Sequence, residues 1–185
     1  IARAAQEAGA QVTLVAGPVA LPTPRGVRRI DVQSASDMLA ACVSAAQSAS
    51  LFVATAAVAD WRPAQPSDQK IKKDGSGLTP TLAFVENPDI LATVAQSARA
   101  LNGALYCVGF AAESHDLLAH ATAKRIRKGV PLLVGNNGPA TFGKDDNALL
   151  LIEGKGTKEL PHASKDLLAR QLVDEIALRL PAVKP

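Results

Sequence analysis

Charged side chains that follow one uncharged segment could together bind a phosphorylated ligand. Residues 51–59 carry no charge, Asp60 comes directly after them, and Lys70 and Lys72 lie in the Pro-, Asp- and Gly-rich segment that follows. In an open parallel sheet, ligands bind beyond the carboxyl ends of the strands. A carboxylate there can accept hydrogen bonds from ribose or help to hold Mg²⁺, and lysine suits phosphate and the charge that develops during nucleotidyl transfer. An Asp that forms a local turn and a solvated basic loop are the alternatives.

A second basic group lies further along the chain. Lys124 and Lys128 are four residues apart, so they share one face of a predicted helix over residues 115–128, where they could reach a ligand at the sheet edge. Cations in the last turns of a helix also oppose its dipole, and that alone would explain the cluster. Phe110, at the end of a predicted strand, could stack on a base or could be a core side chain, and Gly109 could permit close approach of a ligand.

Other polar and sulfur-containing residues are interpreted as structural. The three histidines, His115, His120 and His162, are scattered without an evident nucleophile or metal partner, so we expect surface or capping roles. Cys42 and Cys107 lie in apolar segments without metal-ligand spacing and are expected to be small buried hydrophobic side chains. This cysteine usage is typical of a reducing cytoplasm.

Composition limits the class of protein. The 185 residues are 48% hydrophobic but only 3% aromatic, so one domain over residues 1–185 with an Ala-, Val-, Leu- and Ile-rich core is predicted. The net charge of +3 is spread along the chain, which argues against nucleic-acid binding. No apolar run approaches the roughly 20 residues that a membrane span needs.

The order of elements predicts an α/β fold. A helix over residues 1–8, Gly9 as its C-terminal cap and a strand over 12–15 form the second half of a βαβ unit. The first strand and a glycine-rich phosphate loop are therefore expected upstream, which makes the N-terminus look truncated. Alternation of strands and helices predicts a Rossmann-like three-layer αβα fold with a mostly parallel sheet and a C-terminal antiparallel hairpin.

The remaining elements are expected as follows. Strands are predicted over residues 29–32, 51–58, 78–85, 104–110, 131–134, 148–153 and 157–160. Helices are predicted over residues 37–47 with Ser36 as cap, 87–99 with Asn87 as cap, 115–128, and 164–180 with Ser164 as cap. Residues 60–77 and 135–146 are predicted to be loops.

Several motifs occur here in one order, and their combination is specific although each alone is weak. They are Ala56-Ala57-Val58-Ala59-Asp60-Trp61-Arg62-Pro63, Lys70-Ile71-Lys72-Lys73, Asn87-Pro88-Asp89-Ile90-Leu91, Val108-Gly109-Phe110-Ala111-Ala112-Glu113 and Lys124-Arg125-Ile126-Arg127-Lys128. From Gly9 onward, nearly the whole chain resembles phosphopantothenate–cysteine ligase, the synthetase half of the bacterial bifunctional coenzyme A biosynthesis flavoprotein.

The resemblance implies a reaction and a set of site residues. CTP, accompanied by Mg²⁺, would activate 4′-phosphopantothenate as an acyl-cytidylate, and the amine of L-cysteine would then form the amide and release CMP. Lys70 would be the catalytic residue, and Asp60 would bind the ribose or the metal. The CTP-binding residues implied are Ala54, Thr55, Ala56, Asp60, Lys70, Val85, Glu86, Asn87, Pro88, Phe110, Lys124 and Lys128.

The resemblance also implies a homodimer and a cytoplasmic enzyme that acts on small molecules. The family's glycine-rich segment, with an asparagine that acts on the acyl-cytidylate, is absent before Ile1, so this chain is expected to bind CTP but to turn over poorly or not at all. FMN belongs to the missing decarboxylase half. The alternatives are a Rossmann-type NAD(P)-dependent oxidoreductase, which needs an upstream Gly-x-Gly-x-x-Gly, and a non-catalytic nucleotide-binding module.

Overall fold

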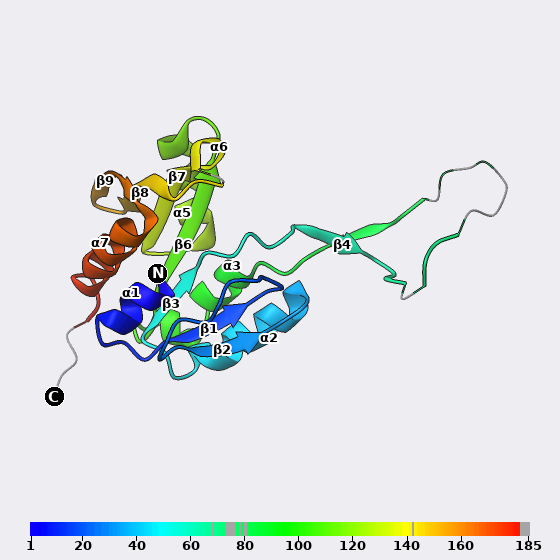
Figure 1. The fold of residues 1–185 in the computed structure, drawn as a ribbon, viewed down its shortest axis with the longest axis horizontal. Coiled ribbons are helices and arrows are strands. Elements are labelled where there is room, and N and C mark those ends of the chain that lie inside the picture. The colour runs from blue at the N-terminus through cyan, green and yellow to red at the C-terminus, as the bar shows by residue number, and fades with distance from the viewer. Residues whose placement is uncertain (68, 73–76, 78, 80, 142, 182–185) are drawn as a thin grey trace.

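The architecture is a five-stranded sheet covered by helices on both faces (Figure 1). The structure is a computed structural model that describes residues 1–181 except 68, 73–76, 78, 80 and 142. The strand order is β3 (Leu51–Ala54), β6 (Tyr106–Glu113), β7 (Leu132–Asn137), β8 (Asp146–Glu153) and β9 (Gly156–Ser164). The first three strands are parallel and the last two form an antiparallel hairpin, which confirms the predicted α/β fold with a C-terminal hairpin.

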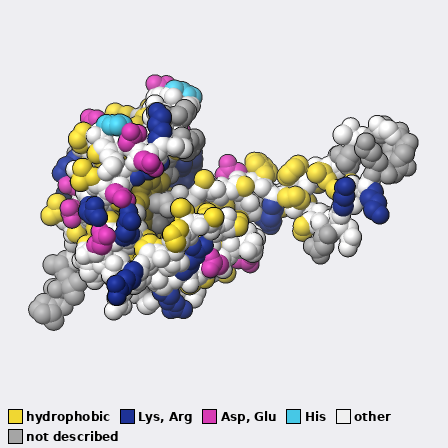
Figure 2. All heavy atoms as spheres, in the orientation of Figure 1, with side chains coloured by type: hydrophobic (Ala, Val, Ile, Leu, Met, Phe, Trp, Pro, Cys, Tyr) yellow, Lys and Arg dark blue, Asp and Glu magenta, His cyan; other side chains and the backbone are white. Residues whose placement is uncertain are grey.

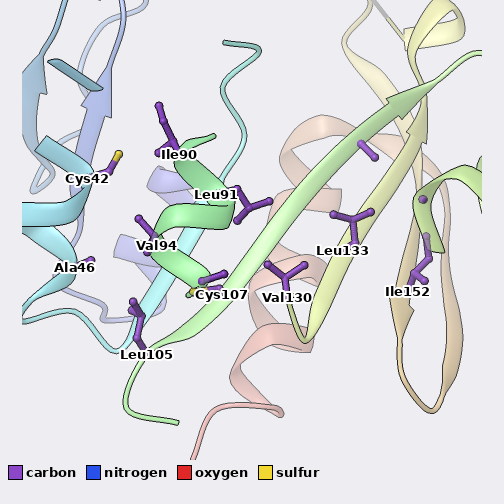
Figure 3. Close-up of a cluster of buried hydrophobic side chains, with 13 residues drawn as sticks. Cys42, Ala46, Ile90, Leu91, Val94, Leu105, Cys107, Val130, Leu133 and Ile152 are labelled. Atoms are coloured by element: carbon purple, nitrogen blue, oxygen red, sulfur yellow. The ribbon is translucent and has the colours of Figure 1, made fainter. Parts of the chain in front are cut away.

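Alternating side chains of the sheet build two separate cores, one on each face. Cys107, Ala111 and Leu133 point towards α2 (Ala35–Ala46), α3 (Ile90–Ala95) and α5 (Leu117–Lys128), as Figure 3 shows for part of this cluster. Val108 and Val134 point the other way, towards α7 (Lys165–Ala177). This period of two is what a strand covered on both faces requires, and it confirms the predicted three layers.

The N-terminal elements stand beside this sheet. Helix α1 (Ala2–Glu7) packs against α7, and Gly9 has a φ of 92°, as expected of a residue that ends a helix. Strands β1 (Thr13–Ala16) and β2 (Arg28–Asp31) pair in parallel with each other, as a two-stranded sheet of their own. Within the described residues, β1 and β2 therefore do not pair with the five-stranded sheet.

Helix starts follow local capping chemistry, and two of the predicted caps are wrong. Ser34, not Ser36, caps α2 and forms a capping box with Asp37. Asp89, not Asn87, caps α3, and Ser97 starts a separate short helix, α4 (Ala98–Leu101). The predicted single helix over residues 87–99 is therefore two helices. Ser164 caps α7 as predicted.

The largest difference from the predicted elements is an arm that projects from the body (Figure 1). Strand β3 ends at Ala54 rather than residue 58, and β4 (Trp61–Pro63) lies in the predicted loop. Strand β4 pairs antiparallel with β5 (Phe84–Glu86), the only strand found among the described part of residues 78–85. Hydrophobic side chains gather along this arm (Figure 2), including Trp61, which is 61% exposed.

The remaining differences are small. Helix α5 begins at Leu117 rather than residue 115, β7 extends to Asn137, and the predicted loop after it contains the short helix α6 (Gly138–Thr141). Among the described residues, no helix is both long and apolar enough to span a membrane.

Candidate functional site

The carboxyl end of β3 leads into the base of the arm, and Asn87 fixes the two segments that meet there. The Asn87 backbone amide donates to the Asp60 carbonyl oxygen at 2.7 Å, and its Nδ2 donates to the Ala59 carbonyl oxygen at 2.8 Å. Two consecutive carbonyl groups are thus held by one residue. The Asp60 side chain is exposed beside them, so its carboxylate remains available to a ligand.

Arg62 completes this junction, although its place in the sequence predicts no such role. Its Nη1 donates to the Glu86 carbonyl oxygen at 2.7 Å and to Asn87 Oδ1 at 3.1 Å. The Asn87 side chain therefore donates at one end and accepts at the other, so its orientation is fixed by its partners. Arg62 stands in the quoted motif directly after Trp61, but only the pairing of β4 with β5 brings it to Asn87.

The basic face of α5 meets this junction through one ion pair. Lys128, in the last turn of α5, pairs with the carboxylate of Asp89, which also accepts from the Ala92 amide at 3.0 Å as the cap of α3. Burial alone would raise the pKa of Asp89, but the hydrogen bonds from Lys128 and the Ala92 amide, together with the charges of Lys128 and Arg127, outweigh it and hold the pKa below its usual value.

Lys124 lies one helical turn before Lys128 and is partly exposed. Within the described residues it has no carboxylate within ion-pairing distance, whereas the Lys128 side chain is only 18% exposed and already paired. The last turn of α5 also contains Arg125 and Arg127. The basic C-terminal end of α5 therefore lies next to residues 87–89, where the chain returns from the arm to the body.

Within one chain, the structure does not bring Lys70 close to Lys124 and Lys128. Lys70 and Lys72 are exposed, and the described residues that follow β4 lie further out along the arm, away from the body (Figure 1). Lys73 lies outside the described residues. The predicted convergence of Lys70 with Lys124 and Lys128 is thus not found in a single copy.

The other predicted contact residues divide between the two sides of the junction. Ala54 is the last residue of β3, and Thr55 and Ala56 follow it and are exposed. Val85 and Glu86 belong to β5, and Pro88 leads into α3. Ala54, Thr55 and Ala56 thus lie at the carboxyl end of β3, whereas Val85 and Glu86 lie in the arm, and the role of all of them towards a nucleotide stays a prediction.

Phe110 and Gly109 serve the packing of the sheet. The Phe110 side chain packs on the α7 face, opposite α3 and α5, as a partly buried core residue. A Cβ atom at Gly109 would lie 2.6 Å from Leu91 Cδ2 and 2.7 Å from Leu133 Cδ1. The absence of that atom lets α3 pack on β6, so the expectation that Gly109 admits a ligand is wrong.

Two histidines that looked unrelated in the sequence lie together in the fold. The rings of His115 and His120 are edge to face with centroids 4.9 Å apart, at the passage from β6 to α5. Both side chains are exposed, which confirms the expected surface position, but the fold brings the two rings together although they are five residues apart. His162 lies elsewhere, with Nε2 3.4 Å from Asp146 Oδ1. Both cysteines are buried as predicted.

Comparison with known proteins gives one consistent family. The model of the DNA/pantothenate metabolism flavoprotein C-terminal domain matches residues 1–179. The chain is 45% identical to the coenzyme A biosynthesis bifunctional protein CoaBC of Vibrio cholerae over 172 residues, which are 91% of this chain and 42% of that protein. It is 44% identical to CoaBC of Escherichia coli over 183 residues, 97% of this chain and 44% of that protein. The chain thus spans less than half the length of these relatives.

Solved structures agree with this comparison. The crystal structure of the C-terminal domain of CoaBC matches with a TM-score of 0.77 and 30% identity, covering 97% of this chain and 79% of that one. A mutant of Cab2 in complex with phosphopantothenate-cysteine matches with a TM-score of 0.63 and 19% identity, covering 83% of this chain and 53% of that one. At that identity the second match establishes the shared fold.

Proposed function

This chain belongs to the DNA/pantothenate metabolism flavoprotein C-terminal domain family, and from that membership we propose that it joins L-cysteine to 4′-phosphopantothenate in coenzyme A biosynthesis. CTP would first activate the carboxylate, which attacks the α-phosphorus to give an acyl-cytidylate while pyrophosphate leaves. The cysteine amine would then attack the acyl carbon, and CMP would leave as the amide forms. Activation is needed because a free carboxylate has no good leaving group.

The observation that supports this proposal most directly is the ion pair between Lys128 and Asp89. It brings the basic end of α5 to the start of α3, immediately after Asn87 and Pro88 and beside the open end of β3. A triphosphate needs positive charge next to a polar edge where its ribose and base can be held. Lys124, partly exposed on the same helix face, is the cation that we propose contacts the phosphates first.

Asp60 is the proposed carboxylate for the ribose or for Mg²⁺. Mg²⁺ is commonly bound by one or two carboxylates together with substrate phosphates, and a single exposed carboxylate at the edge of the site suits that mode. The ion would supply positive charge to the triphosphate. Asn87 keeps Asp60 in place, because it holds the Asp60 and Ala59 carbonyl groups.

Lys70 is proposed to act in a homodimer, in the site of the partner copy. Lys70 follows β4 along the arm and lies away from its own body, so a second body is the simplest place for it to meet a nucleotide (Figure 1). The arm carries exposed hydrophobic side chains, Trp61 at 61%, Leu82 at 49% and Phe84 at 56% exposure, which a second copy would bury. Lys70 would then stabilise negative charge on the reacting phosphate and acyl groups.

Calorimetry with CTP, ATP and NADPH, in the presence of Mg²⁺, tests the nucleotide, and a ligation assay of the full-length protein tests the reaction. We expect CTP to bind once per chain and NADPH not to bind. In the ligation assay, CMP and the amide should appear in equal amounts. Binding of NADPH without binding of CTP would favour the oxidoreductase, and CTP binding without ligation would favour a non-catalytic nucleotide-binding module.

A further inference from the structure

Three potential metal ligands meet where β6 passes into α5, away from the proposed nucleotide site. Ligand atoms of His115, Asp116 and His120 all lie within 4.8 Å of one another, and all three residues are exposed. From His120 to Lys128 the helix rises by about 12 Å, so the group is at the opposite end of α5 from the ion pair with Asp89. The proposed reaction uses none of the three residues.

Each imidazole has its Nδ1 next to a polar side chain, and in the described part of the chain no hydrogen bond or ion pair involves its Nε2. His115 Nδ1 is 2.9 Å from Ser114 Oγ, and His120 Nδ1 is 3.9 Å from Glu113 Oε2. A metal-bound histidine usually engages its second nitrogen with a carboxylate or another polar group, which orients the ring. His115 therefore has a hydrogen-bonded outer partner at Nδ1, Glu113 stands within ion-pairing distance of His120 Nδ1, and no partner of either Nε2 is found among the described residues.

Asp116 supplies the third ligand from a position that ordinarily serves the helix. It stands at the N-cap of α5, but its side chain makes no capping hydrogen bond. Its φ is 44°, and no other non-glycine residue in the described part of the chain has a positive φ. The carboxylate is four residues before His120, so both lie on one side of the first turn. The Asp116 carboxylate therefore does not cap α5, and it lies next to both imidazole rings.

We propose that His115, Asp116 and His120 bind one divalent ion of intermediate softness, Zn²⁺ in the first instance. Two imidazoles and one carboxylate are ligands that zinc accepts, and three protein ligands leave a position for water. Magnesium prefers oxygen ligands and would not compete. The ion would tie the end of β6 to the first turn of α5, so its binding stabilises that junction.

The test is titration of untagged protein with Zn²⁺ by calorimetry, followed by titration with Co²⁺ as a spectroscopic probe. We expect one ion per chain, unchanged by an excess of Mg²⁺, and an increase in the thermal midpoint with Zn²⁺. His120→Gln and His115→Asn should each weaken binding by at least about tenfold, and Glu113→Gln should weaken it less, through the orientation of His120.

His162→Asn is the matched control, because His162 is also exposed and faces a carboxylate, that of Asp146. It should leave zinc affinity unchanged. The thermal midpoints of all variants without metal show whether they fold, and the exposed positions make loss of folding unexpected. The proposal is overturned if the wild-type protein shows no saturable binding, or if His162→Asn weakens binding as much as His120→Gln does.

Discussion

Lys128 and Asp89 form an ion pair that joins the last turn of α5 to the first turn of α3. The two residues are 39 positions apart, so the contact depends on the packing of both helices on the same face of the sheet. Asp89 accepts from the Ala92 amide through the same side chain. One carboxylate therefore starts a helix and also places a lysine beside the proposed nucleotide site.

Replacement of Asp89 should separate these two roles. Asp89→Asn keeps a good capping side chain but removes the charge, so we expect a loss of about 1 kcal/mol at neutral pH. Asp89→Ala should lose a further amount of about 1 kcal/mol, because the Ala92 amide also loses its acceptor. Urea unfolding of the three proteins measures both differences. Equal stability of the Asn and Ala variants would show that capping by Asp89 contributes nothing.

The ionised carboxylate of Asp89 should also make the free energy of unfolding depend on pH in the acidic range. Its pKa in the folded protein lies below the ordinary value of 3.8, because the hydrogen bonds and charges of its partners outweigh burial. The ionised carboxylate therefore stabilises the fold above the unfolded pKa, and this contribution is lost as the pH falls through the folded pKa. The difference in unfolding free energy between wild type and Asp89→Asn should shrink below about pH 4. A difference that stays constant down to pH 2 would contradict this.

The hydrogen bonds of Asn87 should control how firmly the arm is attached. Asn87→Ala removes the bond to the Ala59 carbonyl and the acceptor of Arg62, each worth about 1 kcal/mol. We expect faster hydrogen exchange at the Ala64 amide, which bonds across the arm to the Ala83 carbonyl. Asn102→Ala, at an exposed turn where Asn102 Oδ1 accepts from the Ala104 amide, is the control and should leave that exchange unchanged.

Local signals were sufficient for most of the elements. Ser164 is followed by a helical apolar pattern with Asp166 in its first turn, and it caps α7 as predicted. The hairpin of β8 and β9 follows from an apolar strand, a short glycine-containing turn and a second, mostly polar strand next to it in sequence. In both cases the residues that decide the structure are close in sequence, so the pattern contains the necessary information.

The arm and the capping of α3 could not be predicted in this way. Asn87 has the side chain of a good cap, but its hydrogen bonds go to Ala59 and Arg62, and Asp89 caps the helix instead. Strand β4 exists because Trp61 pairs with Glu86, 25 positions later. The positions of Lys70 and His115 relative to other site residues likewise depend on long-range packing, which motif spacing does not give.

Gly109 is expected to be needed for packing rather than for a ligand. In Gly109→Ala the new Cβ would meet Leu91 and Leu133 at 2.6 and 2.7 Å, so we expect a loss of about 1–3 kcal/mol in unfolding free energy. Gly154→Ala is the control, because the nearest atom to its new Cβ is Arg125 Nη2 at 3.9 Å. Thermal or urea unfolding measures both. A Gly109→Ala protein as stable as the control would mean that α3 can shift without cost.

The cysteines should be unreactive in the folded protein. Burial raises the pKa of Cys107 to about 11 and also raises the pKa of Cys42. Because the thiolate is the reactive form, iodoacetamide at pH 8 should modify neither residue until denaturant is added. Mass spectrometry of the treated protein shows whether either cysteine has been alkylated. Modification of Cys107 without denaturant would show that the α3 face of the sheet opens.

The proposed action of Lys70 in a partner copy makes a quantitative prediction for mixed dimers. Lys70→Gln should bind CTP but lose ligation, and Lys124→Gln should lose ligation through weaker phosphate binding while the ion pair of Lys128 with Asp89 remains. If each site takes Lys70 from one chain and Lys124 from the other, a heterodimer of the two variants contains one intact site. An equal mixture, exchanged to equilibrium, should then recover about a quarter of wild-type activity, because about half of the dimers are heterodimers with one working site of two. No recovery after proven subunit exchange would place Lys70 and Lys124 in the same chain's site, and the arm would then have to fold back onto its own body.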